Sequence, residues 1–123
     1  MKKTVLNLTL LALCGNSLWA QGLKDAYKDY FTIGVAVNKT NVADAEQIAL
    51  IKQEFNSITA ENDMKPVSVH PAEGVWHWEG ADSIANFCRE NGIKLRGHCL
   101  CWHSQFADWM FVDKKGKPVK KEV

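Results

Sequence analysis

The stretch Gly97-His98-Cys99-Leu100-Cys101-Trp102-His103-Ser104-Gln105 directly follows Ile93-Lys94-Leu95-Arg96. Along an extended strand, successive side chains point to opposite faces of the sheet. One predicted face is then apolar along its whole length: Ile93, Leu95, Gly97, Cys99 and Cys101. The other face carries Lys94, Arg96, His98, Leu100 and Trp102. Histidine and tryptophan are unusual on the solvent face of a strand, so we expect the end of this strand to line a binding site.

Two further apolar runs precede this strand. They are Phe31-Thr32-Ile33-Gly34-Val35-Ala36-Val37-Asn38 and Phe55-Asn56-Ser57-Ile58-Thr59-Ala60. Runs rich in β-branched residues suit strands of a parallel sheet that is covered on both faces. The spacing between the two runs predicts a helix capped by Asn41, with inner positions Val42, Ala45, Ile48, Ala49 and Ile51.

A second helix is predicted ahead of the last strand, through Ala81, Ile84, Phe87 and Cys88, with Asn91-Gly92 as its C-terminal cap. Helical spacing also predicts a short lead-in over residues 22–30 and a helix start over residues 119–123. Alternating strands and helices indicate an α/β fold with parallel strands. Three such strands leave two unpaired edges, so we expect residues 21–123 to be the front of a larger barrel or sheet that folds only weakly by itself.

Charge and cysteine content exclude several classes of protein. The 123 residues carry a formal net charge of +1, which gives no electrostatic reason to expect a nucleic-acid partner. An extended backbone holds the side chains of Cys99 and Cys101 too far apart to form a disulfide. We therefore expect Cys88, Cys99 and Cys101 to be small buried hydrophobic residues rather than a disulfide framework.

Residues 1–20 have the layout of a secretory signal peptide. Met1-Lys2-Lys3 is basic, Val5 to Leu13 is mostly apolar, and Ser17-Leu18-Trp19-Ala20 offers a small residue before Gln21. The apolar run is too short to span a membrane, and no other segment is apolar enough. A lipoprotein anchor at Cys14 is a less favoured alternative. We expect a protein that is secreted, periplasmic or attached to the cell surface.

Polar side chains gather where the predicted strands end, which is where ligands bind in parallel α/β folds. These positions are Asn38, then Glu61, Asn62 and Lys65, then His98, Trp102, His103 and Gln105. The set suits a neutral polyhydroxylated ligand, because hydroxyl groups need many fixed donors and acceptors and a pyranose packs on an aromatic ring. We assign Trp76, Trp78 and Trp109 to packing. A zinc site from His98, Cys99, Cys101 and His103 is disfavoured, because the cysteines would point away from His98.

Three motifs together resemble glycoside hydrolase family 10, the endo-1,4-β-xylanases. They are the run 31–38, the run Phe55 to Pro66 that includes Glu61-Asn62-Asp63-Met64-Lys65-Pro66, and the run Arg96 to Gln105. The resemblance implies the front part, about three βα units, of a TIM (β/α)8 barrel that acts on xylan or xylo-oligosaccharides without a cofactor. It places Glu61, Asn62 and Lys65 on the xylose one removed from the cleaved bond, and His98, Trp102 and Gln105 around the sugar that is cleaved. Cys99 and Cys101 depart from the family's usual threonine and aliphatic residue.

The resemblance also implies that no catalytic residue is present in this chain. Retaining glycosidases use two carboxyl groups about 5–5.5 Å apart, and the family pattern puts both glutamates after later strands, beyond Val123. The first alternative is therefore a sugar-binding fragment of a split or interrupted xylanase that does not turn over substrate. The second is an unrelated small secreted redox or metal protein that uses Cys88, Cys99 and Cys101.

We predict that Gln21 is the N-terminus of the mature, exported protein, because the order of basic, apolar and small residues before it matches a cleaved signal. N-terminal sequencing of secreted material checks this. Recovery of intact Met1 on cytoplasmic protein would contradict it.

Overall fold

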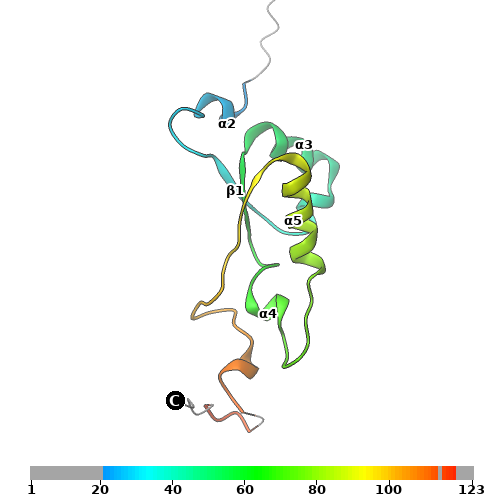
Figure 1. The fold of residues 1–123 in the computed structure, drawn as a ribbon, viewed down its shortest axis with the longest axis vertical. Helices are drawn as coiled ribbons and strands as arrows, with labels where there is room; N and C mark the ends of the chain where they lie inside the picture. The colour runs from blue at the N-terminus through cyan, green and yellow to red at the C-terminus, as the bar shows by residue number, and fades with distance from the viewer. Residues whose placement is uncertain (1–20, 114, 119–123) are drawn as a thin grey trace, which may run out of the picture.

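The computed structural model describes residues 21–113 and 115–118 (Figure 1). The predicted signal peptide and the predicted helix start at 119–123 lie outside these residues. Within the described part, no helix combines the length and the apolarity needed to cross a bilayer.

A three-stranded parallel sheet forms the centre of the fold. Its strands β1 (Gly34–Val37), β2 (Ser57–Ala60) and β3 (Lys94–Arg96) lie in the order β1-β2-β3. Val37 pairs with Ala60, and Thr59 pairs with Arg96, so the carboxyl ends of the strands meet at one edge. The parallel order is confirmed, and each strand is shorter than the apolar run that predicts it.

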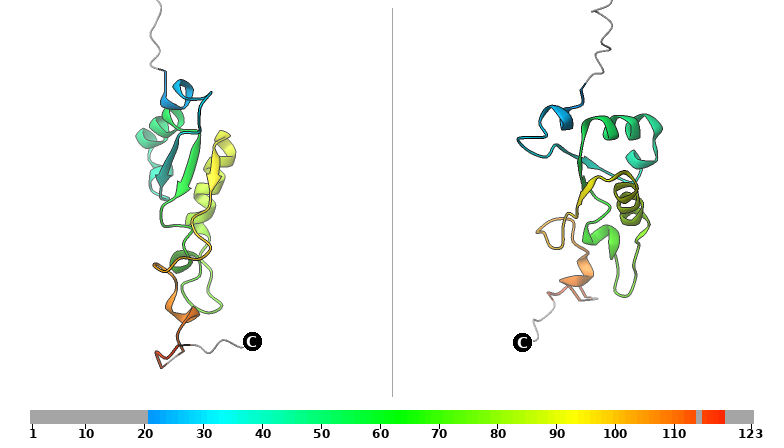
Figure 2. Two further views of the ribbon diagram at one scale, coloured as in Figure 1. Left: turned by 90° about the vertical axis from the view of Figure 1, so that its left-hand side faces the viewer. Right: turned by 45° about the horizontal axis from the view of Figure 1, so that its top comes forward.

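Two longer helices, α3 (Ala45–Glu54) and α5 (Glu79–Asn91), follow β1 and β2 and lie on one side of the strands (Figures 1 and 2). They meet the sheet in one buried cluster in which Ile58 and Ile84 are fully buried. The other members are Val37, Val42, Ile51, Ala60, Phe87 and Cys88. The opposite side of β1 is exposed at Gly34 and Ala36, so the helices cover one face of the described sheet.

The predicted cap of the first long helix was wrong. Asn41 begins the short 3-10 helix η1 (Asn41–Ala43), and α3 starts later, at Ala45, where the Asp44 carboxylate accepts the N–H of Gln47 at 2.9 Å. Asn41 instead accepts the backbone N–H of Asn38 through its side-chain oxygen. Both residue types cap helices well, and the tight turn after β1 occupies Asn41 first. The lead-in helix α2 (Leu23–Ala26) is shorter than predicted.

The end of α5 agrees with the sequence. Gly92 has φ 64°, a left-handed conformation that costs glycine little, and its N–H donates to the carbonyl of Cys88. This turn directs the chain into β3, where Ile93 packs against the core cluster.

The strand predicted to continue through Trp102 ends at Arg96, which corrects the sequence interpretation. Residues 97–107 follow without regular structure, and the peptide bond between His98 and Cys99 is cis. Leu100 is fully exposed, Cys101 is exposed and Cys99 is half-buried, so Cys99 and Cys101 are not the buried hydrophobic residues expected; Cys88 is. In the described part of the chain β3 pairs only with β2, and a strand without a second neighbour lacks the hydrogen bonds that would keep it extended.

The long loop before α5 is held by stacked aromatic rings. It begins with the one-turn helix α4 (Pro66–Val69) and leads to α5, and its residue His70 contacts the 3-10 helix η2 (Asp108–Met110) through Trp109. The buried His70 ring stacks on Trp76 with centroids 3.6 Å apart, and Trp76 stacks on Trp78 at 5.2 Å. The Trp109 indole N–H donates to the His70 carbonyl at 2.9 Å. The predicted packing role is supported for Trp109, whereas Trp76 and Trp78 stack on neighbouring rings but remain 52% and 50% exposed, so their role in packing stays a prediction.

We predict that the three thiols in the described part of the chain, Cys88, Cys99 and Cys101, react in order of exposure. Cys101 is exposed, whereas burial raises the pKa of the Cys88 thiol and lowers its thiolate fraction. Alkylation of Cys88 also requires the core to open locally. An opening free energy of about 1.4 kcal/mol already lowers the alkylation rate of Cys88 about tenfold. Alkylation followed by peptide mass spectrometry measures the three rates, with 6 M guanidinium as the unfolded control. Equal rates without denaturant would contradict the fold.

Candidate sugar-binding site

The site lies beyond the carboxyl ends of β2 and β3. At the end of β2, the Glu61 N–H donates to the carbonyl of Val37 on β1 at 2.8 Å. The chain then turns, with the Lys65 N–H bonded to the Asn62 carbonyl at 3.0 Å, and Pro66 opens α4. Proline suits the first turn of a helix, because the N–H that it lacks has no partner there. These turns place Asn62 and Lys65 next to the segment that follows β3.

Lys65 is the centre of the site. Its side chain is only 7% exposed, and its ammonium donates to the Asn62 side-chain oxygen at 2.9 Å and to the Gln105 side-chain oxygen at 2.5 Å. The ammonium also lies 5.3 Å from the centre of the Trp102 ring, within range of a cation–π interaction. A buried charge is costly unless it is paired in this way, so Lys65 fixes three neighbours around itself.

Gln105 joins the two halves of the site. Its carbonyl accepts the N–H of Val67 at 3.3 Å, and its side-chain amide lies 3.4 Å from the Asn62 oxygen. Gln105 has φ 54°, a left-handed conformation that costs a residue with a Cβ roughly 1–2 kcal/mol. Its bonds to Lys65, Val67 and Asn62 offset that cost.

Aromatic rings extend the site from Trp102. His98 lies edge-on to Trp102 with centroids 6.1 Å apart, and His103 lies edge-on to the same ring at 5.2 Å. Trp102 keeps 37% of its surface exposed. An indole that is fixed by its neighbours but still open to solvent offers an apolar surface on which a sugar ring can pack.

Of the predicted site residues, Asn62, Lys65, Gln105, Trp102, His98 and His103 come together. Glu61 is exposed at the end of β2 and lies outside this hydrogen-bonded group. Asn38 serves its own turn, because its side-chain oxygen accepts the N–H of Thr40 at 3.0 Å and that of Asn41 at 3.2 Å.

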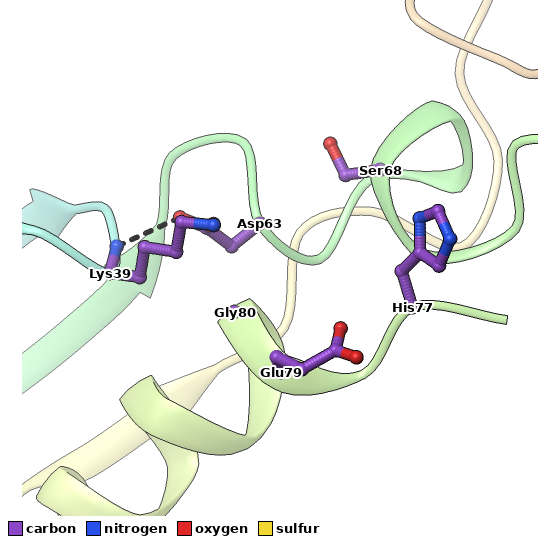
Figure 3. A pocket seen from close by; sticks show the side chains of 6 residues that line it. All are labelled: Lys39, Asp63, Ser68, His77, Glu79 and Gly80. Atoms are coloured by element: carbon purple, nitrogen blue, oxygen red, sulfur yellow. Dashed lines mark hydrogen bonds between the residues drawn. The ribbon is translucent and has the colours of Figure 1, made fainter.

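Sequence reasoning missed the role of Asp63, which lies between two predicted site residues. Its carboxylate accepts the Lys39 N–H at 3.0 Å and faces the start of α5 at Gly80 (Figure 3). An acidic residue inside a ligand-binding motif was the available signal. Among residues 21–113 and 115–118, no three His, Cys, Asp or Glu residues are grouped so as to hold a metal ion.

The arrangement can bind an uncharged ligand rich in hydroxyl groups. An ammonium and two imidazoles lie near one indole ring, and two side-chain amides are hydrogen-bonded to that ammonium. The sequence matches the profile of glycosyl hydrolase family 10 over residues 22–123. The chain belongs to this family.

The sequence is also similar to known endo-1,4-beta-xylanases. The chain is 65% identical to the endo-1,4-beta-xylanase/feruloyl esterase of Xylanibacter ruminicola, over 100% of its own length and 18% of the relative's. It is 43% identical to endo-1,4-beta-xylanase A of Halalkalibacterium halodurans, over 82% of its own length and 25% of the relative's. The chain thus spans about a fifth to a quarter of these relatives.

Solved structures establish the fold. The chain superposes on a psychrophilic glycoside hydrolase family 10 endo-beta-1,4-xylanase with a TM-score of 0.80 and 64% identity, covering 83% of this chain and 31% of that one. Xylanase B from Clostridium stercorarium F9 gives a TM-score of 0.74 and 45% identity, covering 79% and 28%. The predicted fold, the front part of a TIM (β/α)8 barrel, is confirmed.

We predict that Gln105→Ala destabilises the barrel, because it leaves the buried Lys65 ammonium short of a partner. The test protein, called the graft protein below, carries residues 22–123 in place of the matching segment of the psychrophilic xylanase. Loss of one charged hydrogen bond should lower its unfolding free energy by about 1.5–3 kcal/mol in urea. Gln53→Ala, an exposed change on α3, is the control. Equal midpoints for the two variants would show that the Lys65–Gln105 bond does not stabilise the fold.

Proposed function

We propose that this chain is the N-terminal part of the catalytic barrel of a secreted endo-1,4-β-xylanase, a retaining glycosidase that hydrolyses xylan. In this proposal the chain supplies part of the groove that binds xylan and xylo-oligosaccharides. Glu61, Asn62 and Lys65 hold the xylose one removed from the cleaved bond, and His98, Trp102 and Gln105 surround the xylose at that bond. No cofactor is needed for hydrolysis by two carboxyl groups.

One observation carries the proposal: the hydrogen-bonded group of Asn62, Lys65 and Gln105 beside the open Trp102 ring. A xylose unit offers hydroxyl groups at its edge and C–H groups on its faces. The fixed polar groups match the edge, and the indole matches a face. The donors are already oriented by Lys65, so binding a sugar requires little rearrangement of the protein. The relatives named above as endo-1,4-beta-xylanases support xylan as the substrate.

Hydrolysis itself needs groups that these residues do not supply. A retaining mechanism uses one carboxyl group as the acid and base and a second as the nucleophile, about 5–5.5 Å apart. Near the site, Asp63 is already bonded to the Lys39 N–H, and Glu61 follows a different strand from the one the family pattern requires. We propose that both catalytic glutamates belong to the parts of the barrel that this chain does not span. Export through the signal peptide of residues 1–20 would bring the enzyme to its insoluble substrate.

We predict that Glu61→Ala and Lys65→Ala in the graft protein lower kcat/KM on xylo-oligosaccharides about tenfold or more. Each change removes a charged hydrogen bond to a substrate hydroxyl, which contributes roughly 1.5–3 kcal/mol. Glu73→Ala, an exposed carboxylate in the loop before α5, is the matched control. Steady-state kinetics on xylotetraose measures the effect. Wild-type kinetics for both variants would remove Glu61 and Lys65 from the substrate groove.

We predict that residues 21–123 alone release no reducing sugar from xylan. Positioned hydrogen bonds orient a sugar, but they provide no proton for the leaving oxygen and no nucleophile at the anomeric carbon. A reducing-sugar assay on the purified chain, with the graft protein as the positive control, checks this. Xylan cleavage by the chain together with a cooperative melt would overturn the assignment of catalysis to other parts of the barrel.

A further inference from the structure

Asp63 lies where three segments meet, namely its own loop after β2, the turn after β1 and the first turn of α5. A pocket of about 400 Å³ opens there, lined by Lys39, Asp63, Ser68, His77, Glu79 and Gly80 (Figure 3). Asn62 and Lys65, on either side of Asp63 in the sequence, direct their polar ends to each other and to Gln105. The Asp63 side chain therefore leaves the loop in a different direction from the two sugar-binding side chains that flank it.

Two contacts fix the Asp63 carboxylate. One oxygen accepts the backbone N–H of Lys39 at 3.0 Å, which ties the loop to the turn after β1. The other oxygen lies so close to Gly80 that a Cβ built there would stand 2.5 Å from it and 3.2 Å from the Asp63 Cβ. Only a residue without a side chain lets the first turn of α5 approach Asp63 this closely.

The carboxylate also suits the charge at that end of α5. The backbone N–H groups in the first turn of a helix carry partial positive charge and favour a nearby anion. The cap residue of α5, Trp78, provides no side-chain hydrogen bond to this turn. The first turn of α5 already holds the acidic residues Glu79 and Asp82, and the Asp63 carboxylate adds a negative charge from another segment beside Gly80.

We propose that Asp63 is a positioning residue for the sugar-binding loop, an inference that rests on the proposed function. By joining the loop to the turn after β1 and to α5, it holds Asn62 and Lys65 in place for the xylose one removed from the cleaved bond. Without the carboxylate, the loop keeps the Glu61 N–H bond to Val37 and the Lys65 N–H bond to Asn62. Neither of those bonds reaches α5.

The test compares two substrates of the graft protein that differ by one sugar. A dinitrophenyl β-xylobioside needs the sugar that Asn62 and Lys65 hold, whereas a dinitrophenyl β-xyloside does not. Asp63→Ala should lower kcat/KM about tenfold on the xylobioside, mainly through KM, and change it by less than about twofold on the xyloside. Asp63→Asn keeps an oxygen that can accept the Lys39 N–H, so it should restore most of the xylobioside activity.

Gly80→Ala tests the second contact independently, because its new methyl group must displace the carboxylate. It should reproduce the selective loss on the xylobioside, and Asp29→Ala, an exposed carboxylate after α2, should not. An equal loss on both substrates for Asp63→Ala, or no loss on either, would overturn the positioning role. A graft protein that cleaves neither substrate would overturn the proposed function, and the inference with it.

Discussion

Pairing of the buried Lys65 ammonium is the constraint on which the site depends. A charge held at 7% exposure must be compensated by fixed dipoles or rings, and Asn62, Gln105 and Trp102 provide them. This requirement brings the segment after β3 against the loop after β2. It also keeps Gln105 in a left-handed conformation that would otherwise be unfavourable. The same groups that stabilise the ammonium are those that we propose meet the substrate.

The sheet and its helices supply the frame for that constraint. The parallel register sets the ends of β2 and β3 side by side, so two loops distant in sequence start from neighbouring points. The buried cluster around Ile58 and Ile84 fixes α3 and α5 on one face of the sheet. Asp63 connects the site to this frame, because it contacts both the turn after β1 and the start of α5.

Features decided by local patterns were predictable from the sequence. The apolar runs located all three strands, and Asn91-Gly92 located the end of α5. Features decided by distant partners were not. The extent of β3 depends on a neighbouring strand, so alternation alone extended it wrongly into the irregular segment with Leu100 and Cys101. Asn41 and Asp44 are both good caps, and only the turn after β1 decides between them. The motifs placed Lys65 and Gln105 in one site, but the sequence does not show that these two side chains are hydrogen-bonded to each other.

The bond between Lys65 and Gln105 spans 40 residues of chain, and this has a consequence for synthesis. At about 5–20 residues per second, Gln105 is added roughly 2–8 s after Lys65. During that interval the ammonium has no partner from the later segment and stays in water. The pairing of β1 with β2 involves no residue beyond Ala60, whereas the bond that closes the loop after β2 forms only when the chain beyond β3 emerges. Completion of the candidate sugar-binding site thus waits for the segment after β3, which leaves the ribosome later than the loop after β2.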